Sequence, residues 1–188
     1  FVAGDAQLGA AYEQQIKPLV WSRSNRAAIV ENARNMRKRV LDLIPAAEKD
    51  REIKLGRGGL RDVEFTAQLL QLVHGVTDES VRVPDTLSAV SALSEAGLIG
   101  RQDADVFRSH YQTLRAIEHR VQLSKLRRDH LMPTDESELR RISRGMQLPA
   151  GALDRLDFVV AGADKKVERA VRDASLLLSQ QAQSQIDP

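Results

Sequence analysis

The sequence predicts an all-α fold, a multi-helix bundle of about six helices with a Gly-rich loop before the central one. Apolar residues recur every three or four positions through several long segments, and proline or glycine stands between them. No segment alternates apolar and polar residues as a strand would, except at 52–55. With 188 residues, 42% of them hydrophobic, the chain can bury one sizeable core, so we expect a single helical domain over 1–188.

Composition narrows the class of protein further. The absence of cysteine excludes disulfides and thiolate metal sites and suits a reducing, cytoplasmic compartment. No apolar run reaches the ~20 residues of a membrane span, and no signal-peptide pattern opens the chain. The net charge of +2 is too near neutral to indicate bulk nucleic-acid binding. Because the first residue is Phe1, we expect the sequence to be part of a longer polypeptide.

Two helices are predicted before the Gly-rich loop. Asp5 fits the N-cap of the first, which should reach about Val20. Ser24 or Asn25 caps the second, which Pro45 ends after Ile44. The apolar face of the second helix consists of Ile29, Ala33, Met36, Val40 and Leu43. Its basic residues are Arg34, Arg37, Lys38 and Arg39. They fit a solvated face or, alternatively, a surface that contacts nucleotide or RNA.

The Gly-rich loop is basic as well as flexible. Gly56, Gly58 and Gly59 lie among the cations Lys54, Arg57 and Arg61. Glycine permits positive φ, and the N–H groups at a helix start favour anions. The residues therefore indicate contact with a phosphate or nucleotide, although a plain turn between two elements also accounts for the glycines.

The helix after the loop is expected to be buried. Two apolar stripes cover most of its circumference: Val63, Ala67, Leu70, His74 and Phe65, Leu69, Leu72, Val76. A polar line runs between them, formed by Arg61, Glu64, Gln68 and Gln71. Because buried polar groups need partners, this line indicates either a specific site or hydrogen bonds between helices.

Further helices complete the predicted bundle. Pro84 should open a helix that ends at Gly97, and Arg101 or Asp103 should begin the longest one. The apolar stripe of that long helix is Val106, His110, Leu114, Ile117 and Val121. On this stripe His110 fits a core residue better than a ligand, and no metal site is supported. Its basic end, namely Arg115, Arg120, Lys125, Arg127, Arg128 and His130, fits a solvated face or an interaction surface.

The last third of the sequence predicts two more helices. The turn and cap at 133–136 should start a short helix that reaches about Met146. A long amphipathic helix should follow from Asp154 to about Leu177, and 179–188 should form a tail or linker.

At this point a family resemblance becomes specific. The run from Lys54 to Phe65, continued through Gly75, resembles the signature of glutamine synthetase adenylyltransferase. That family adds AMP to a tyrosine of glutamine synthetase and removes it, using two nucleotidyltransferase units that each precede a helical domain. The remoter uridylyltransferase of the nitrogen-regulatory signal protein has a similar Gly-Gly-Leu-Arg-Asp run. The segment 114–123 resembles a second block of the family, commoner in its AMP-removing half.

The resemblance implies a role for the loop residues. Lys54, Gly56, Arg57, Gly58, Gly59 and Arg61 would form the nucleotide or phosphate site. Asp62, Glu64 and Gln68 would orient the loop or contact a neighbouring domain. In the AMP-removing half, inorganic phosphate attacks the AMP–tyrosine link and releases ADP. The helix over 1–22 would be the junction from a preceding catalytic domain, with 23–178 as the bundle.

The catalytic part of the family pattern is missing. Nucleotidyl transfer uses carboxylates that hold Mg²⁺, which the family supplies from a Gly-Ser…Asp-x-Asp motif on a sheet. Only Asp103-Ala104-Asp105 has the spacing here, and we interpret it as a helix cap. We therefore expect no catalytic residue and no metal site in this part. Mg²⁺ and ATP or ADP would be bound mainly by the preceding domain.

Three functional hypotheses follow. The first is a helical domain that completes the nucleotide site of an adjacent nucleotidyltransferase domain, with glutamine synthetase and a nitrogen-regulatory signal protein as partners. The second is a protein-interaction module that docks glutamine synthetase or a regulatory protein, with a purely structural Gly-rich loop. The third, nucleic-acid binding by the Arg-rich stretches, is disfavoured by the small net charge and the few aromatic residues.

Overall fold

The computed structural model describes residues 2–22 and 26–147, and this part of the chain contains six α-helices and no β-strand. In chain order they are α1 (Ala6–Val20), α2 (Arg26–Asp42), α3 (Leu60–His74), α4 (Thr86–Glu95), α5 (Arg101–Lys125) and α6 (Glu136–Gly145). Two 3-10 turns, η1 (Lys49–Arg51) and η2 (Glu79–Val81), stand before α3 and α4. The all-α prediction is confirmed. The caps expected at Ser24 or Asn25, the helix expected from Asp154 and the tail expected at 179–188 lie outside the described residues.

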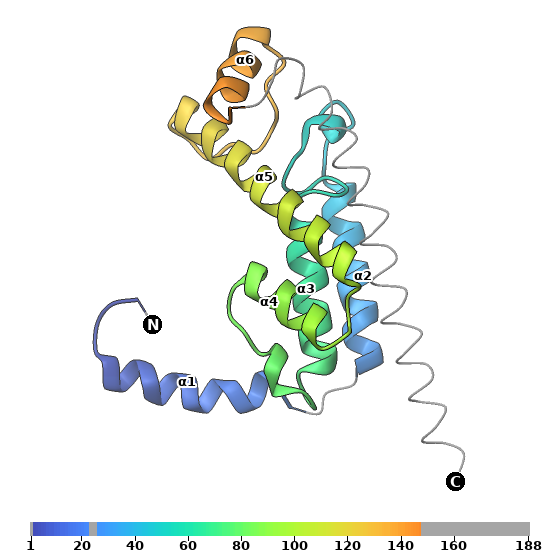
Figure 1. Cartoon of the computed structure of the whole chain (residues 1–188), viewed down its shortest axis with the longest axis vertical. Helices are drawn as coiled ribbons and strands as arrows, with labels where there is room; N and C mark the ends of the chain where they lie inside the picture. Colours follow the sequence, from blue (N-terminus) through green and yellow to red (C-terminus); the bar gives the residue numbers. More distant parts are fainter. Residues whose placement is uncertain (1, 23–25, 148–188) are drawn as a thin grey trace.

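Helix α3 is the centre of the bundle, as its sequence predicts. It packs against α2, α4 and α5, and ten of its fifteen residues are buried. Helix α5 extends beyond this contact and packs against α6 near its other end. In Figure 1, α6 and α1 lie at opposite ends of the structure, with α3 and α4 between them.

The apolar core has three parts. Between α3, α4 and α5 it contains Val63, Leu70, Val90, Leu93 and Phe107, among others. Where the Gly-rich loop meets α5 and α6, it contains Ile53, Leu60, Leu114, Ile117, Val121 and Ile142. The smallest part joins α2 to α3 through Val30, Leu69 and Val73. The Gly-rich loop is therefore anchored in the core on its inner side.

Aspartates begin three of the helices. Asp5, Asp85 and Asp135 each accept a backbone N–H of the first turn of α1, α4 and α6. The prediction that Pro84 opens α4 is wrong, because Asp85 takes the cap position. The cap interpretation of Asp103 is also wrong: Gly100 is the N-cap of α5, and Asp103 lies within the first turn.

Helix α2 departs from its predicted form in two ways. It ends at Asp42 instead of Ile44, and two residues of its predicted apolar face, Met36 and Leu43, are exposed. Only its first half packs against α3 through apolar side chains, while Arg37 in its second half binds the Gly-rich loop through polar contacts. The strand suggested at 52–55 is absent from the described structure, where Glu52 forms only an isolated bridge to Leu131.

Candidate functional site

The buried carboxylate of Glu52 shapes the start of the Gly-rich loop. Its Oε1 accepts the N–H groups of Lys54 and Leu55, both at 2.9 Å, and its Oε2 lies 3.0 Å from Nε2 of His130. The backbone nearby is paired too, since the Ile53 N–H donates to the His130 carbonyl. The segment after α5 therefore supports the loop from behind.

The glycines allow the loop to fold back on itself. A Cβ on Gly56 would stand 2.2 Å from the Glu52 carbonyl oxygen, and one on Gly59 would meet three carbonyl oxygens at 2.8–3.0 Å. Gly58 has a φ of +70°. Its N–H donates to Oδ2 of Asp62, and the Gly59 N–H donates to the Gly56 carbonyl. Gly58 and Gly59 thus use their N–H groups for contacts within the chain, one to a carboxylate and one to a backbone carbonyl oxygen.

Asp62 and Arg37 tie the loop to α2. The Asp62 carboxylate, which receives the Gly58 N–H, also pairs with Arg37. The same guanidinium donates to the carbonyl oxygens of Leu55 and Gly56, at 2.7 and 2.9 Å. The solvated face predicted for this part of α2 is therefore wrong at Arg37, whose side chain is 17% exposed. Helical spacing could not show that a loop 18 residues away would pack there.

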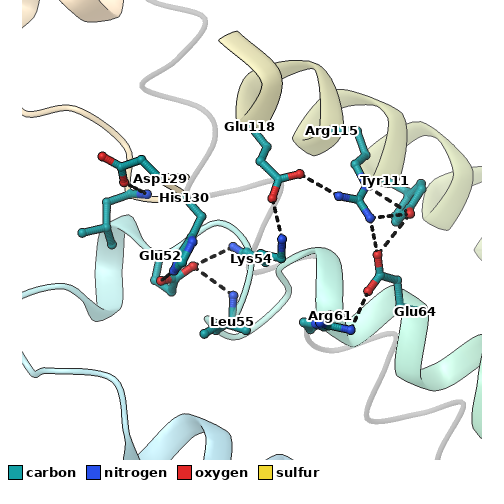
Figure 2. A network of polar contacts seen from close by, with 11 residues as sticks. Glu52, Lys54, Leu55, Arg61, Glu64, Tyr111, Arg115, Glu118, Asp129 and His130 are labelled. Carbon is teal, nitrogen blue, oxygen red and sulfur yellow. Dashed lines mark hydrogen bonds and ion pairs between the residues drawn. The ribbon is translucent and has the colours of Figure 1, made fainter. Parts of the chain in front are cut away.

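A chain of alternating charges crosses from the loop to α5, as Figure 2 shows. Lys54 Nζ donates to Oε1 of Glu118 at 2.9 Å, and Arg115 donates to the other Glu118 oxygen at 2.7 Å. Arg115 also pairs with Glu64 on α3, which in turn lies 3.3 Å from NH1 of Arg61. Tyr111 joins the network at Arg115 and Glu64, donating to Glu64 and accepting from Arg115. We call these six residues the charge network.

The acidic and the basic side chains of the network differ in solvent exposure. The side chains of Glu64 and Glu118 are 10% and 2% exposed, whereas those of Lys54, Arg115 and Arg61 are 25%, 32% and 40% exposed. The carboxylates lie underneath, and the cations reach the surface. Three cations stand against two carboxylates, so the network carries a formal charge of +1.

Burial and pairing act in opposite directions on Glu118. Burial raises the pKa of this carboxyl, but its hydrogen bonds to Lys54 and Arg115 outweigh burial and hold the pKa below the usual value. Glu118 therefore stays ionised at neutral pH and keeps both cations in place. The Lys54 ammonium has three N–H donors and uses one of them on Glu118, so the other two can bond to further acceptors.

The remaining predicted site residues have different surroundings. Arg57 is exposed at the outer side of the loop, and Gln68 is exposed on α3, one turn beyond Glu64. Gln71, on the same polar line, is buried and donates to the carbonyl oxygens of Val81 and Val83. The predicted line thus divides into a site end at Arg61 and Glu64, and a structural end at Gln71.

Sequence reasoning missed the part of the network that lies on α5. Arg115 was assigned to a solvated or interaction face, and Tyr111 and Glu118 received no role, although they lie four residues before and three residues after it. That spacing places all three on one side of a helix, which is the signal that could have grouped them. Nothing local indicates that Glu52 and His130, 78 positions apart, meet behind the loop.

Two further observations bear on cofactors and membranes. Within the described ranges, His, Asp and Glu residues nowhere gather in a group of three that could hold a metal ion. Asp103 and Asp105 both lie on α5, and neither belongs to such a group, so the described residues do not fit a Mg²⁺ site. None of the described helices is long and apolar enough to span a membrane.

Comparisons of the sequence with known proteins point to one family. A profile of the GlnD PII-uridylyltransferase family matches residues 34–174, which include the loop, α3 and α5. The chain is also similar to proteins named bifunctional glutamine synthetase adenylyltransferase/adenylyl-removing enzyme. It is 53% identical to the one from Leifsonia xyli subsp. xyli over 80% of this chain, and 51% identical to that of Streptomyces coelicolor over 78%. The relative from Cutibacterium acnes is 48% identical over 90% of this chain.

These relatives are much longer proteins. The matched region amounts to 15–17% of their length, so this chain corresponds to one part of them. The family predicted from the Lys54–Phe65 run is confirmed by matches that extend well beyond that run. On this evidence the chain belongs to the GlnD PII-uridylyltransferase family, within the group of glutamine synthetase adenylyltransferase/adenylyl-removing enzymes.

Proposed function

We propose that this chain is the helical domain that completes a phosphate or nucleotide site of a neighbouring nucleotidyltransferase domain, in an enzyme that adenylylates and de-adenylylates glutamine synthetase. Such an enzyme would act in the control of nitrogen assimilation. The observation that carries this proposal is the charge network, with its cations outward and its carboxylates beneath. The names of the similar proteins supply the reaction.

The network suits an anion for electrostatic reasons. The carboxylates hold the cations in fixed positions, so no ordering of long side chains has to occur on binding. Lysine and arginine N–H donors at this surface can make charge-assisted hydrogen bonds to phosphate oxygens. The network carries a formal charge of +1 because its three cations, Lys54, Arg61 and Arg115, outnumber its two carboxylates. Arg57 extends the basic surface along the loop.

The loop residues then take distinct roles. Lys54, Arg57 and Arg61 contact phosphate oxygens, while Gly56, Gly58 and Gly59 give the turn its shape. Asp62 and Glu64 orient the loop, and Gln68 faces the neighbouring domain. Catalytic carboxylates with Mg²⁺, and most contacts to ATP or ADP, belong to that neighbouring domain, because the residues described here do not fit the metal. The enzyme acts in the cytoplasm.

The test uses the full-length enzyme and inorganic phosphate as the varied substrate. Lys54→Ala should weaken the apparent affinity for phosphate in the AMP-removing reaction by tenfold or more, since it removes one charge-assisted contact. Lys49→Ala is the matched control, because Lys49 is an exposed lysine on η1 that is not a member of the charge network. An unchanged phosphate dependence and rate for Lys54→Ala, in an enzyme with an unchanged unfolding midpoint, would refute the role of the loop.

A specific surface feature favours the second function, a protein-interaction module. At the end of α5, Leu123 and Leu126 are 70% and 89% exposed beside a shallow hollow. The other residues that line the hollow are His119, Gln122, Arg127 and Arg128. This surface would dock glutamine synthetase or a signal protein. Capture of glutamine synthetase by the chain, together with a melting temperature that nucleotide and phosphate leave unchanged, would favour this function over the first.

A further inference from the structure

Helix α1 is capped, but the described part of the chain buries none of its residues. Asp5 caps it through the N–H groups of Gln7 and Leu8, yet none of its residues is buried. Its large apolar side chains are exposed, namely Leu8 (71%), Tyr12 (65%), Leu19 (69%) and Val20 (44%). An isolated helix of this length is only marginally stable in water, and helices in proteins gain most of their stability by packing an apolar face.

Three of these exposed residues share one face of the helix. Leu8, Tyr12 and Leu19 are separated by four and seven positions, which places them within about 40° of one another around the helix. Ala10 and Gln14 lie on the opposite side. The two charged residues of α1, Glu13 and Lys17, pair with each other at 3.3 Å. The Leu8–Tyr12–Leu19 face therefore carries no charged residue, and Gln15 is the polar residue on it.

The base of α1 is fixed to the bundle. Trp21 follows the helix directly, and its ring lies where a Cβ on Gly75 would come within 2.7 Å of it. The guanidinium of Arg82 stacks over the same ring, 5.4 Å from its centroid. Arg82 also donates to the Gly75 carbonyl. Anchored in this way, α1 extends outward from the end of the bundle that lies away from α6 (Figure 1).

We propose that the Leu8–Tyr12–Leu19 face docks into an apolar groove on the nucleotidyltransferase domain of the same, longer polypeptide. This inference rests on the proposed function. A neighbouring domain is the favoured occupant because the chain corresponds to only 15–17% of the length of its relatives. A largely apolar face without charges also suits a permanent contact within one polypeptide better than a steered, transient encounter with a charged partner. Docking there would fix the orientation of the charge network toward the catalytic domain.

The test compares hydrogen exchange of the α1 amides in the full-length enzyme and in the 188-residue chain. We expect exchange to be at least a hundredfold slower in the full-length enzyme, because docking buries the helix. Leu8→Asp should abolish this protection without breaking the helix, since an acidic residue in the first turn favours helix formation. Gln14→Asp, on the opposite face, should leave the protection unchanged.

Two results would overturn the inference. Equal, fast exchange of α1 in both proteins would mean that the neighbouring domain does not cover it. A dimer of the 188-residue chain in sedimentation velocity, lost in Leu8→Asp, would assign the face to a second copy instead. Failure of the proposed phosphate role is distinguishable, because exchange of α1 is measured without nucleotide or phosphate and does not depend on Lys54.

Discussion

The Gly-rich loop and helix α1 differ in how firmly contacts within this chain hold them. The loop is held from three sides: Arg37 on α2 binds its carbonyl oxygens, Glu118 on α5 binds Lys54, and Glu52 and Asp62 accept its N–H groups. Helix α1 has one cap, one anchoring tryptophan and no buried residue. The difference indicates that the loop is complete within this chain, whereas α1 is built for a surface outside it.

The largest expected effect tests whether the loop is as tightly determined as its contacts indicate. Gly56→Ala should destabilise the chain by about 3 kcal/mol or more, because a Cβ 2.2 Å from the Glu52 carbonyl forces the backbone to move. Urea unfolding followed by circular dichroism gives the free energy of unfolding. Gly100→Ala is the control: its Cβ would meet nothing closer than 3.7 Å, so we expect a change below about 1 kcal/mol. Equal losses for the two variants would show that the loop is adaptable.

This contrast also explains what the sequence could predict. Helical spacing gave the buried centre at α3, and local capping chemistry gave Asp5 and the cap before α6, because these signals lie within a few residues of one another. The loop glycines were recognised as a functional or turning segment for the same reason. Their internal hydrogen bonds were not foreseen, since Asp62 can satisfy the Gly58 amide only in one specific fold of the turn.

Contacts distant in the sequence were the ones that could not be predicted. Arg37 and Arg115 look like members of solvated basic faces. Only tertiary packing brings the distant carboxylates of Asp62 and Glu64 to them. Conversely, Met36 and Leu43 continue the apolar spacing of α2 but have no surface to cover them among the described residues. Periodicity shows which side chains share a face, and tertiary structure decides what that face meets.

The second expected effect concerns the stability of the segment after α5, which supports the loop, at acid pH. Burial raises the pKa of Asp129, but hydrogen bonds from Lys125 and the Leu131 N–H, with Lys125 and Arg127 nearby, lower it from 3.8 to about 2. Because the folded-state pKa is depressed, the unfolded chain binds more protons between these values. Stability from Asp129 is fully present above about pH 4 and is lost as pH falls through 2.

Asp129→Asn should therefore cost about 1–2 kcal/mol at neutral pH, after a discount for the solvent-exposed Arg127, and should flatten the stability curve between pH 4 and 2. The measurement is urea unfolding at a series of pH values. Asp105→Asn, which changes an exposed carboxylate on α5, serves as control. The same steepness in the Asp129→Asn variant and the unchanged chain would show that the segment after α5 does not depend on this carboxylate.

The smallest expected effect is at α1, and it tests the other side of the comparison. In the 188-residue chain, Tyr12→Ser should change the free energy of unfolding by less than about 0.5 kcal/mol, because the side chain is 65% exposed and leaves no cavity. Trp21→Ala, one residue beyond the helix, should cost about 2 kcal/mol through lost packing on Gly75 and lost stacking with Arg82. A loss above about 1 kcal/mol for Tyr12→Ser would mean that α1 already packs within this chain. The Leu8–Tyr12–Leu19 face would then need no partner. The loop and α1 would both be held by contacts within this chain, and only the strength of those contacts would differ.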